Sequence, residues 1–106
     1  MSELRRIAEL PEVRGAILSD PSGGLLDAVR EPEAESAAAV AGFLASTLAE
    51  AGEELGLGAL RLVKFGGRNQ ACLLMARDGL LTMAFVEPAA AVATVERAFE
   101  GLAQER

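Results

Sequence analysis

The chain of 106 residues contains no His, no Trp and no Tyr, and only one Cys. Without His there is no imidazole to act as a general base, and the usual Ser-His and Cys-His nucleophile pairs cannot form. The single thiol, Cys72, excludes an internal disulfide and a metal cluster built from several Cys ligands. Because Cys72 stands within the apolar run Gln70–Met75, we expect a plain buried thiol. These absences predict a protein that is not an enzyme, with no catalytic residue, no metal and no cofactor.

Basic residues are also scarce, since 10 Lys and Arg stand against 16 Asp and Glu and leave a net charge of −6. Such a chain repels phosphate backbones and anionic lipid, so we expect no nucleic-acid partner and no membrane partner. No apolar run is long enough to span a bilayer. Arg5 and Arg6 resemble the start of a signal peptide, but Pro11 interrupts the segment that follows. The expected location is the cytosol.

Two glycine-rich segments, Pro21–Gly24 and Gly66–Asn69, could suggest a nucleotide site. Neither leads into a Gly-Lys-Ser/Thr phosphate loop or into a helix, so hairpin turns explain both. The acidic clusters Glu33/Glu35 and Glu53/Glu54 lack the spacing of a metal-binding loop, and they are interpreted as solvated helix surface.

The length suits one domain, residues 1–106, and 51% hydrophobic residues are sufficient for one core. Apolar periodicity and turn residues predict helix, two strands, helix, three strands and helix. The expected ranges are 2–10 with Ser2 as N-cap, 15–20, 25–29, 33–55, 59–65, 70–76, 80–86 and a last helix opening at Glu87-Pro88. The strands Leu73–Met75 and Met83–Val86 are apolar at successive positions, which indicates helices on both faces of the sheet.

The long central helix carries two apolar stripes. The larger stripe, predicted to pack on the sheet, is Ala37, Ala41, Leu44, Leu48, Ala51 and Leu55. The second stripe holds nothing larger than a methyl group: Ala38, Gly42, Ala45, Ala49 and Gly52. Small residues let two helix backbones approach closely, so this small-residue stripe predicts a helix–helix contact with another chain.

Alanine is the best helix former, and an Ala-rich composition is therefore a second explanation of the small-residue stripe. The two glycines favour the contact, because Gly costs about 1 kcal/mol relative to Ala inside a helix. Phe43 falls in the polar sector of the same helix. It is either an incidental exposed side chain or a contact residue for a partner.

The phrases Val13–Asp20 and Glu53–Gly58, together with Gly24 and the order of elements, resemble the Roadblock/LC7 family over nearly the whole chain. This resemblance implies an α+β fold, αββαβββα, in which a five-stranded antiparallel sheet has the order 2-1-5-4-3. The first and last helices would lie on one side of the sheet and the long helix on the other.

The resemblance also implies a homodimer, with third strands paired edge to edge and the long helices packed antiparallel. The expected interface then consists of the small-residue stripe and the edge strand: Ala38, Gly42, Ala45, Ala49, Gly52, Leu60, Leu62 and Lys64. Phe43 is the candidate residue for binding a further partner.

Family members of the gliding-motility type bind a Ras-like small GTPase and can promote GTP hydrolysis, so the resemblance implies a GTPase regulator. They are thought to rearrange the catalytic residues of the GTPase itself, and no catalytic residue is therefore assigned here. Arg68, at a predicted hairpin tip, is the weaker candidate for an arginine finger. The alternative is a dynein-light-chain-like scaffold without a GTPase. A small-molecule sensor would need converging polar groups, which the sequence does not display.

Overall fold

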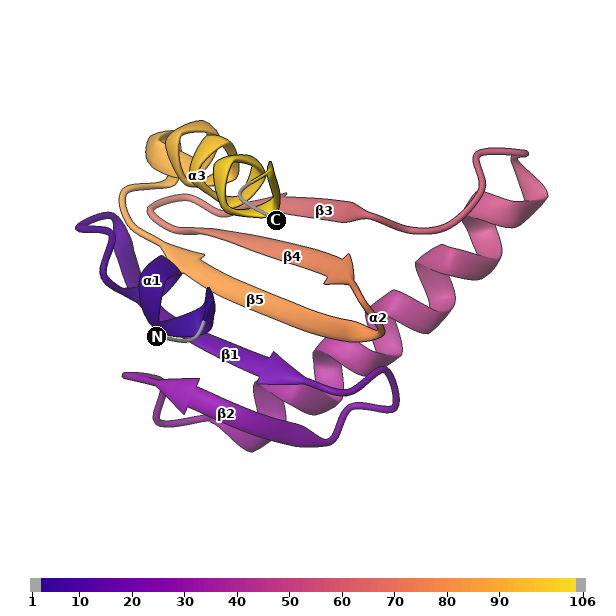
Figure 1. The fold of residues 1–106 in the computed structure, drawn as a ribbon, viewed down its shortest axis with the longest axis horizontal. Coiled ribbons are helices and arrows are strands. Elements are labelled where there is room, and N and C mark those ends of the chain that lie inside the picture. Colours follow the sequence, from indigo (N-terminus) through magenta and orange to yellow (C-terminus); the bar gives the residue numbers. More distant parts are fainter. Residues whose placement is uncertain (1–2, 105–106) are drawn as a thin grey trace.

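The computed structural model describes residues 3–104, in which one five-stranded sheet lies between helices (Figure 1). The helices are α1 (Glu3–Ala8), α2 (Ala34–Glu54) and α3 (Val92–Gln104), with a 3-10 turn η1 (Ala89–Ala91) before α3. The strands are β1 (Val13–Ser19), β2 (Leu25–Val29), β3 (Leu62–Gly66), β4 (Ala71–Arg77) and β5 (Leu80–Val86). The predicted ranges of β2 and β5 are confirmed, whereas β3 begins at Leu62 and not at Ala59. The predicted N-cap, Ser2, lies outside the described residues.

The order of strands in the sheet is β2-β1-β5-β4-β3, and every neighbouring pair is antiparallel. The α+β fold and the strand order predicted from the sequence are both confirmed. The two central strands, β1 and β5, align Ala16 with Ala84 and Ile17 with Met83. This order leaves β2 and β3 at the two edges, where a strand has backbone groups that no neighbour in the sheet can satisfy.

One face of the sheet is covered by α1 and α3 (Figure 1). Val95 and Phe99 of α3 are fully buried, and they join Ile7 of α1. These side chains pack on Leu73 and Ala84 of the sheet. Burial of a side chain such as Phe or Ile stabilises the fold by about 1.5–3 kcal/mol, so this layer is a principal core of the domain.

The opposite face of the sheet packs against α2, and this second core is built differently. Leu74 and Met83 of the sheet meet the alanine side chains of α2, among which Ala38 and Ala41 are completely buried. Alanine projects little from a helix, so the axis of α2 can lie close to the strands. The prediction that both faces of the sheet are covered is therefore confirmed.

The turn between β1 and β2 is held by Asp20, whose Oδ1 accepts hydrogen bonds from the backbone N–H groups of Ser22 and Gly24, both at 2.9 Å. The Gly24 bond is the largest contribution that lowers the pKa of Asp20 below its ordinary value. Gly23 in this turn has a φ of +95°, which favours glycine. The turn is a fixed structure against which α2 can pack.

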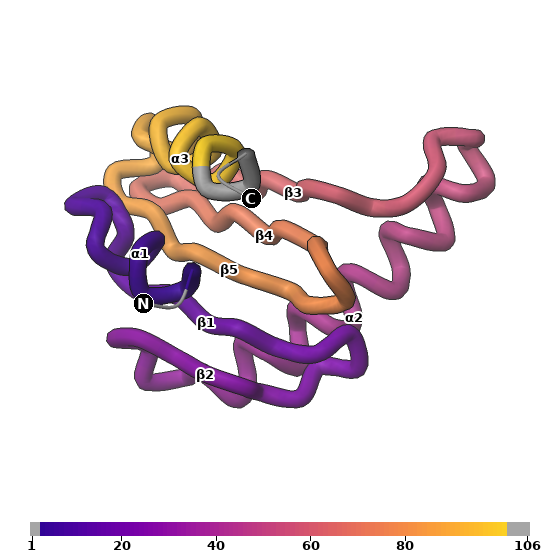
Figure 2. The backbone as a smooth tube through the Cα atoms, viewed as in Figure 1, coloured from indigo at the N-terminus to yellow at the C-terminus, as the bar shows by residue number. Residues whose placement is uncertain are grey.

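The last turns of α2 extend beyond the sheet, and the connection to β3 turns back from there (Figures 1 and 2). Leu55 and Leu57 are 73% and 77% exposed at this point, which we call the projecting end. Within residues 3–104 no helix has the length and apolar character that crossing a membrane requires.

Candidate protein-interaction surface

The small-residue stripe of α2 does not form an exposed seam in its first half. Ala38 is completely buried, Ala45 is 9% exposed and Gly42 is buried, all within this chain. A Cβ placed on Gly42 would lie 2.6 Å from the Cα of Gly23, because the helix backbone rests directly on the β1–β2 turn. The prediction that these three positions form a bare stripe is therefore wrong: close approach explains the glycine, but the approach is intramolecular.

The second half of the stripe is only partly covered. Ala49 lines an open groove of about 530 Å³ between α2 and the β4–β5 turn, together with Leu60. Gly52 is half-buried, and its carbonyl accepts a hydrogen bond of 2.8 Å from the backbone N–H of Leu57. For Ala49, Gly52 and Leu60 an interface role stays a prediction.

The larger apolar stripe also departs from the prediction. Ala41 is buried on the sheet, but Leu44 and Leu48 are half-buried, and Ala51 and Leu55 are exposed. The helical period had placed Ala51 and Leu55 in the core. They are not there, because α2 has already passed the edge of the sheet when it reaches them (Figure 1).

On α2, Val40 is 52% exposed and Phe43 is 70% exposed. The expectation that Phe43 is exposed is confirmed, whereas its role in binding a partner stays a prediction. Large apolar side chains that are exposed close together are unusual on a protein that acts alone. Val40 and Phe43 are therefore candidate contact residues.

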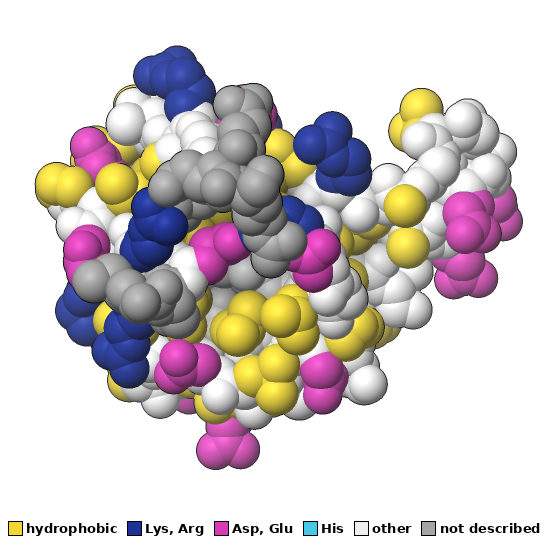
Figure 3. Space-filling model, viewed as in Figure 1, with side chains coloured by type: hydrophobic (Ala, Val, Ile, Leu, Met, Phe, Trp, Pro, Cys, Tyr) yellow, Lys and Arg dark blue, Asp and Glu magenta, His cyan; other side chains and the backbone are white. Residues whose placement is uncertain are grey.

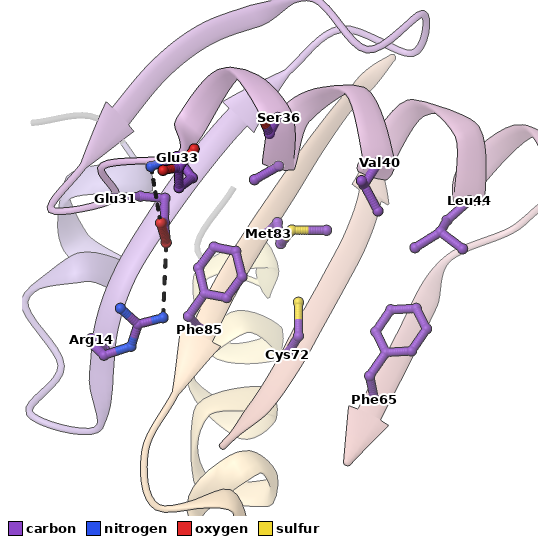
Figure 4. Close-up of a pocket in the computed structure, with 11 residues that line it drawn as sticks. Arg14, Glu31, Glu33, Ser36, Val40, Leu44, Phe65, Cys72, Met83 and Phe85 are labelled. Atoms are coloured by element: carbon purple, nitrogen blue, oxygen red, sulfur yellow. Dashed lines mark hydrogen bonds and ion pairs between the residues drawn. The ribbon is translucent and has the colours of Figure 1, made fainter. Parts of the chain in front are cut away.

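Beside Val40 an apolar groove opens between α2 and the sheet, with a volume of about 460 Å³ (Figure 4). In the close-up, Leu44 and Val40 of α2 face Phe65 of β3 and Cys72 of β4 across this space. At the far end of the groove, Arg14 lies 3.9 Å from Glu31, and its guanidinium lies 5.6 Å from the centre of the Phe85 ring. The groove suits an apolar side chain better than a polar ligand.

Cys72 in this groove does not have the character of a nucleophile. Burial raises the pKa of its thiol to about 12, so the thiol is protonated at neutral pH. Reactive cysteines have the opposite property, a lowered pKa. Among residues 3–104 no three His, Cys, Asp or Glu side chains are arranged to hold a metal ion. Arg68 is exposed in the β3–β4 turn, and its role as an arginine finger stays a prediction.

The edge strand β3 continues the surface of the groove. Phe65 is 36% exposed, and its neighbour Lys64 makes an ion pair of 2.8 Å with Glu96 of α3. Leu62 is half-buried against the core that α1 and α3 cover, on the face away from α2. Side chains of β3 therefore belong to both faces of the sheet, and what the strand offers a partner is its free backbone edge. For Leu62 and Lys64 an interface role stays a prediction.

No protein-family profile and no curated protein matches the sequence of this chain. Solved structures do match it. MglB of Myxococcus xanthus is 11% identical, with a TM-score of 0.79 over 93% of this chain and 87% of that chain. A Roadblock/LC7 domain from Streptomyces avermitilis is 19% identical, with a TM-score of 0.71 over 98% and 94% of the two chains. An MglB structure with a tetrameric arrangement is 19% identical, with a TM-score of 0.77 over 95% and 82%.

Proposed function

We propose that this chain, which has the Roadblock/LC7 fold that the sequence resemblance implied, is a non-catalytic homodimer that binds a Ras-like small GTPase and regulates it or serves as its scaffold. The observation that carries the proposal is the gathering of exposed apolar side chains on α2 and β3. Val40, Phe43, Leu55, Leu57 and Phe65 are all at least one-third exposed, and all belong to these two elements or to their connection.

Self-association is supported by the edge of β3. In the described chain β3 pairs with β4 alone, so its other edge can add a second strand. One of the solved structures with this fold has a tetrameric arrangement, which is consistent with association between like chains. Two antiparallel copies of α2 would then present two copies of Phe43, one from each protomer.

A GTPase as the further partner follows from the resemblance to the gliding-motility group and from the character of the surface. Phe43 stands between acidic and hydroxyl side chains of α2, and an aromatic anchor within a polar surround is typical of a binding hot spot. Preference for the GTP state would arise because the γ-phosphate orders the switch loops that a regulator contacts.

The test is calorimetric titration of the dimer with Ras-like GTPases of the same organism, each loaded with GDP or with a GTP analogue. We expect tighter binding in the GTP state. Phe43→Ala should weaken binding at least about tenfold, because truncation of a hot-spot residue costs about 2 kcal/mol and 1.4 kcal/mol is one decade. Leu26→Ala, at an exposed leucine on the opposite edge strand β2, is the matched control and should leave affinity unchanged.

Equal affinity for both nucleotide states, or no heat with any GTPase, would contradict the GTPase proposal. Such a result would favour the second candidate, a scaffold subunit of the dynein-light-chain kind that holds other chains together. The exposed β3 edge and the apolar surface of α2 suit that role as well.

A further inference from the structure

The negative charge of this chain is confined to one segment. Six of the 16 Asp and Glu residues lie in residues 31–58, which contain α2 and parts of the connections on either side, and none of the 10 Lys and Arg residues does. In the rest of the chain ten acidic and ten basic residues cancel, so the net charge of −6 belongs entirely to this segment. In the space-filling view, Asp and Glu side chains gather on the projecting end, with no Lys or Arg among them (Figure 3).

Contacts with other parts of the chain do not neutralise the carboxylates of α2. Each ion pair described within residues 3–104 uses a carboxylate outside α2, as in the 2.8 Å pair of Glu96 with Lys64. Arg14 lies 3.9 Å from Glu31, but that residue precedes the helix. The carboxylates within α2 are all exposed, and no ion pair joins them to a cation of residues 3–104: Glu35, Glu50, Glu53 and Glu54.

Three of these carboxylates weaken the helix that carries them. Glu50, Glu53 and Glu54 are three and four residues apart, a spacing at which like charges on a helix repel one another. They also stand in the last turns of α2, where the helix dipole ends in negative partial charge and no basic residue balances it. A charge pattern that costs its own helix stability is explained when a cationic surface outside the chain faces it.

Two of the carboxylates lie on the same side of α2 as Phe43. Phe43, Thr47, Glu50 and Glu54 follow one another at spacings of four, three and four residues, so they form one line along the helix. We call these four residues the outer line; all are exposed, whereas the completely buried Ala38 lies on the other side of the helix. At 1.5 Å per residue, Glu50 is about 10 Å and Glu54 about 16 Å along the axis from Phe43.

We propose that the outer line of α2 binds a cationic protein surface: an apolar pocket receives Phe43, and basic side chains about 10 Å and 16 Å further along face Glu50 and Glu54. The inference rests on the proposed function and specifies its partner, a Ras-like GTPase that carries basic residues beside an apolar pocket. The aromatic anchor supplies affinity. The carboxylates accelerate the encounter with a basic partner and reject acidic ones.

The test is stopped-flow association with the GTPase that the calorimetric titration identifies, loaded with a GTP analogue. The variant is Glu50→Gln/Glu54→Gln, which removes two charges and keeps the size of both side chains. We expect its association rate constant to be at least about fivefold lower than that of the wild type at about 0.05 M salt. The two rates should converge at about 0.5 M salt, because the screening length is then only a few ångströms.

The matched control removes the same charge elsewhere. Glu9, directly after α1, and Glu100 of α3 are both exposed, on the side of the sheet away from α2. Glu9→Gln/Glu100→Gln should change the association rate by less than about twofold. Urea unfolding is a second readout: the outer-line variant should be as stable as the wild type or more stable, since repulsion at the end of the helix is removed. Slower binding then has no origin in a damaged fold.

The outcomes are distinguishable. Slower association at low salt in the outer-line variant alone supports the inference. Equal slowing in both double variants means that net charge and not the outer line acts, and equal rates in all three proteins mean that charge is irrelevant. Either result overturns the inference and leaves the GTPase proposal standing. A wild type that binds no GTPase overturns the proposed function and this inference with it.

Discussion

The two parts of α2 lie in different surroundings, although both contain Ala, Gly and Leu. In the first part, residues 34–45, buried alanines pack on the sheet, and Gly42 lies against the β1–β2 turn. The second part, residues 46–54, is more polar, although it still contains Leu48, Ala49, Ala51 and Gly52, and all of its residues are half-buried or exposed. One continuous helix thus serves two purposes: its first part completes the core, and its second part extends away from it.

This difference shows that residue size alone does not identify the surface that a helix buries. Alanine and glycine in the first part permit a close approach within the chain. In the second part Leu48 is half-buried, and Leu55, directly after it, is 73% exposed. The two interior glycines, Gly42 and Gly52, separate these environments most clearly, because the same substitution at each should have opposite effects on stability.

The largest effect is expected at Gly42. Its missing Cβ would lie 2.6 Å from both the Cα and the N of Gly23, so Gly42→Ala must displace the helix or the turn. Overpacking of this kind costs about 3 kcal/mol against backbone, and the gain in helix propensity returns about 1 kcal/mol, for a net loss of about 2 kcal/mol. Urea unfolding at fixed protein concentration measures it. An unchanged or higher midpoint would mean that helix and turn are not in contact.

Gly52→Ala should have the opposite sign and a smaller magnitude. A Cβ at this position would meet the carbonyl oxygen of Gly58 at 3.4 Å, which is ordinary van der Waals contact. Replacing Gly by Ala inside a helix should therefore raise the free energy of unfolding by up to about 1 kcal/mol. The same urea titration tests this change. A loss of stability comparable to that of Gly42→Ala would contradict the division of α2 into two parts.

Much of the fold could be predicted from the sequence, because local signals agree with the final architecture. The turns at Asp20–Gly24 and Asp78–Gly79 separate short apolar runs, and both connect antiparallel neighbours in the sheet. The strands Leu73–Met75 and Met83–Val86, apolar at successive positions, indicated helices on both faces of the sheet. Strand order came from the family resemblance, since hydrophobic pattern alone does not determine which strands are neighbours.

The candidate surface was harder to predict, because a helical wheel contains no information about where the sheet ends. Leu44 and Leu55 share a stripe, yet one borders the core and the other is 73% exposed. The contact between Gly42 and Gly23 joins residues far apart in the sequence through backbone atoms, and no side-chain pattern reports such an approach. Phe43 was correctly placed outside, since it falls in the sector of the helix that holds Ser46 and Glu50.

The smallest effect that distinguishes the two ends is electrostatic. Glu35 lies in the first turn of α2, where a carboxylate favours the helix dipole, whereas Glu54 lies in the last turn, where it opposes it. Glu54→Lys removes this repulsion and places a cation four residues after Glu50, which should together contribute about 0.5–1 kcal/mol of stability. Glu35→Lys is the matched control and should destabilise the chain by a similar amount. Both are best measured at a protein concentration at which sedimentation shows the monomer, so that association does not contribute to unfolding. The difference between the two variants should shrink in about 1 M salt, where the screening length falls to about 3 Å. If Glu54→Lys has no effect at low salt while Glu35→Lys does, the end of α2 is frayed in solution and presents Leu55 from a non-helical segment.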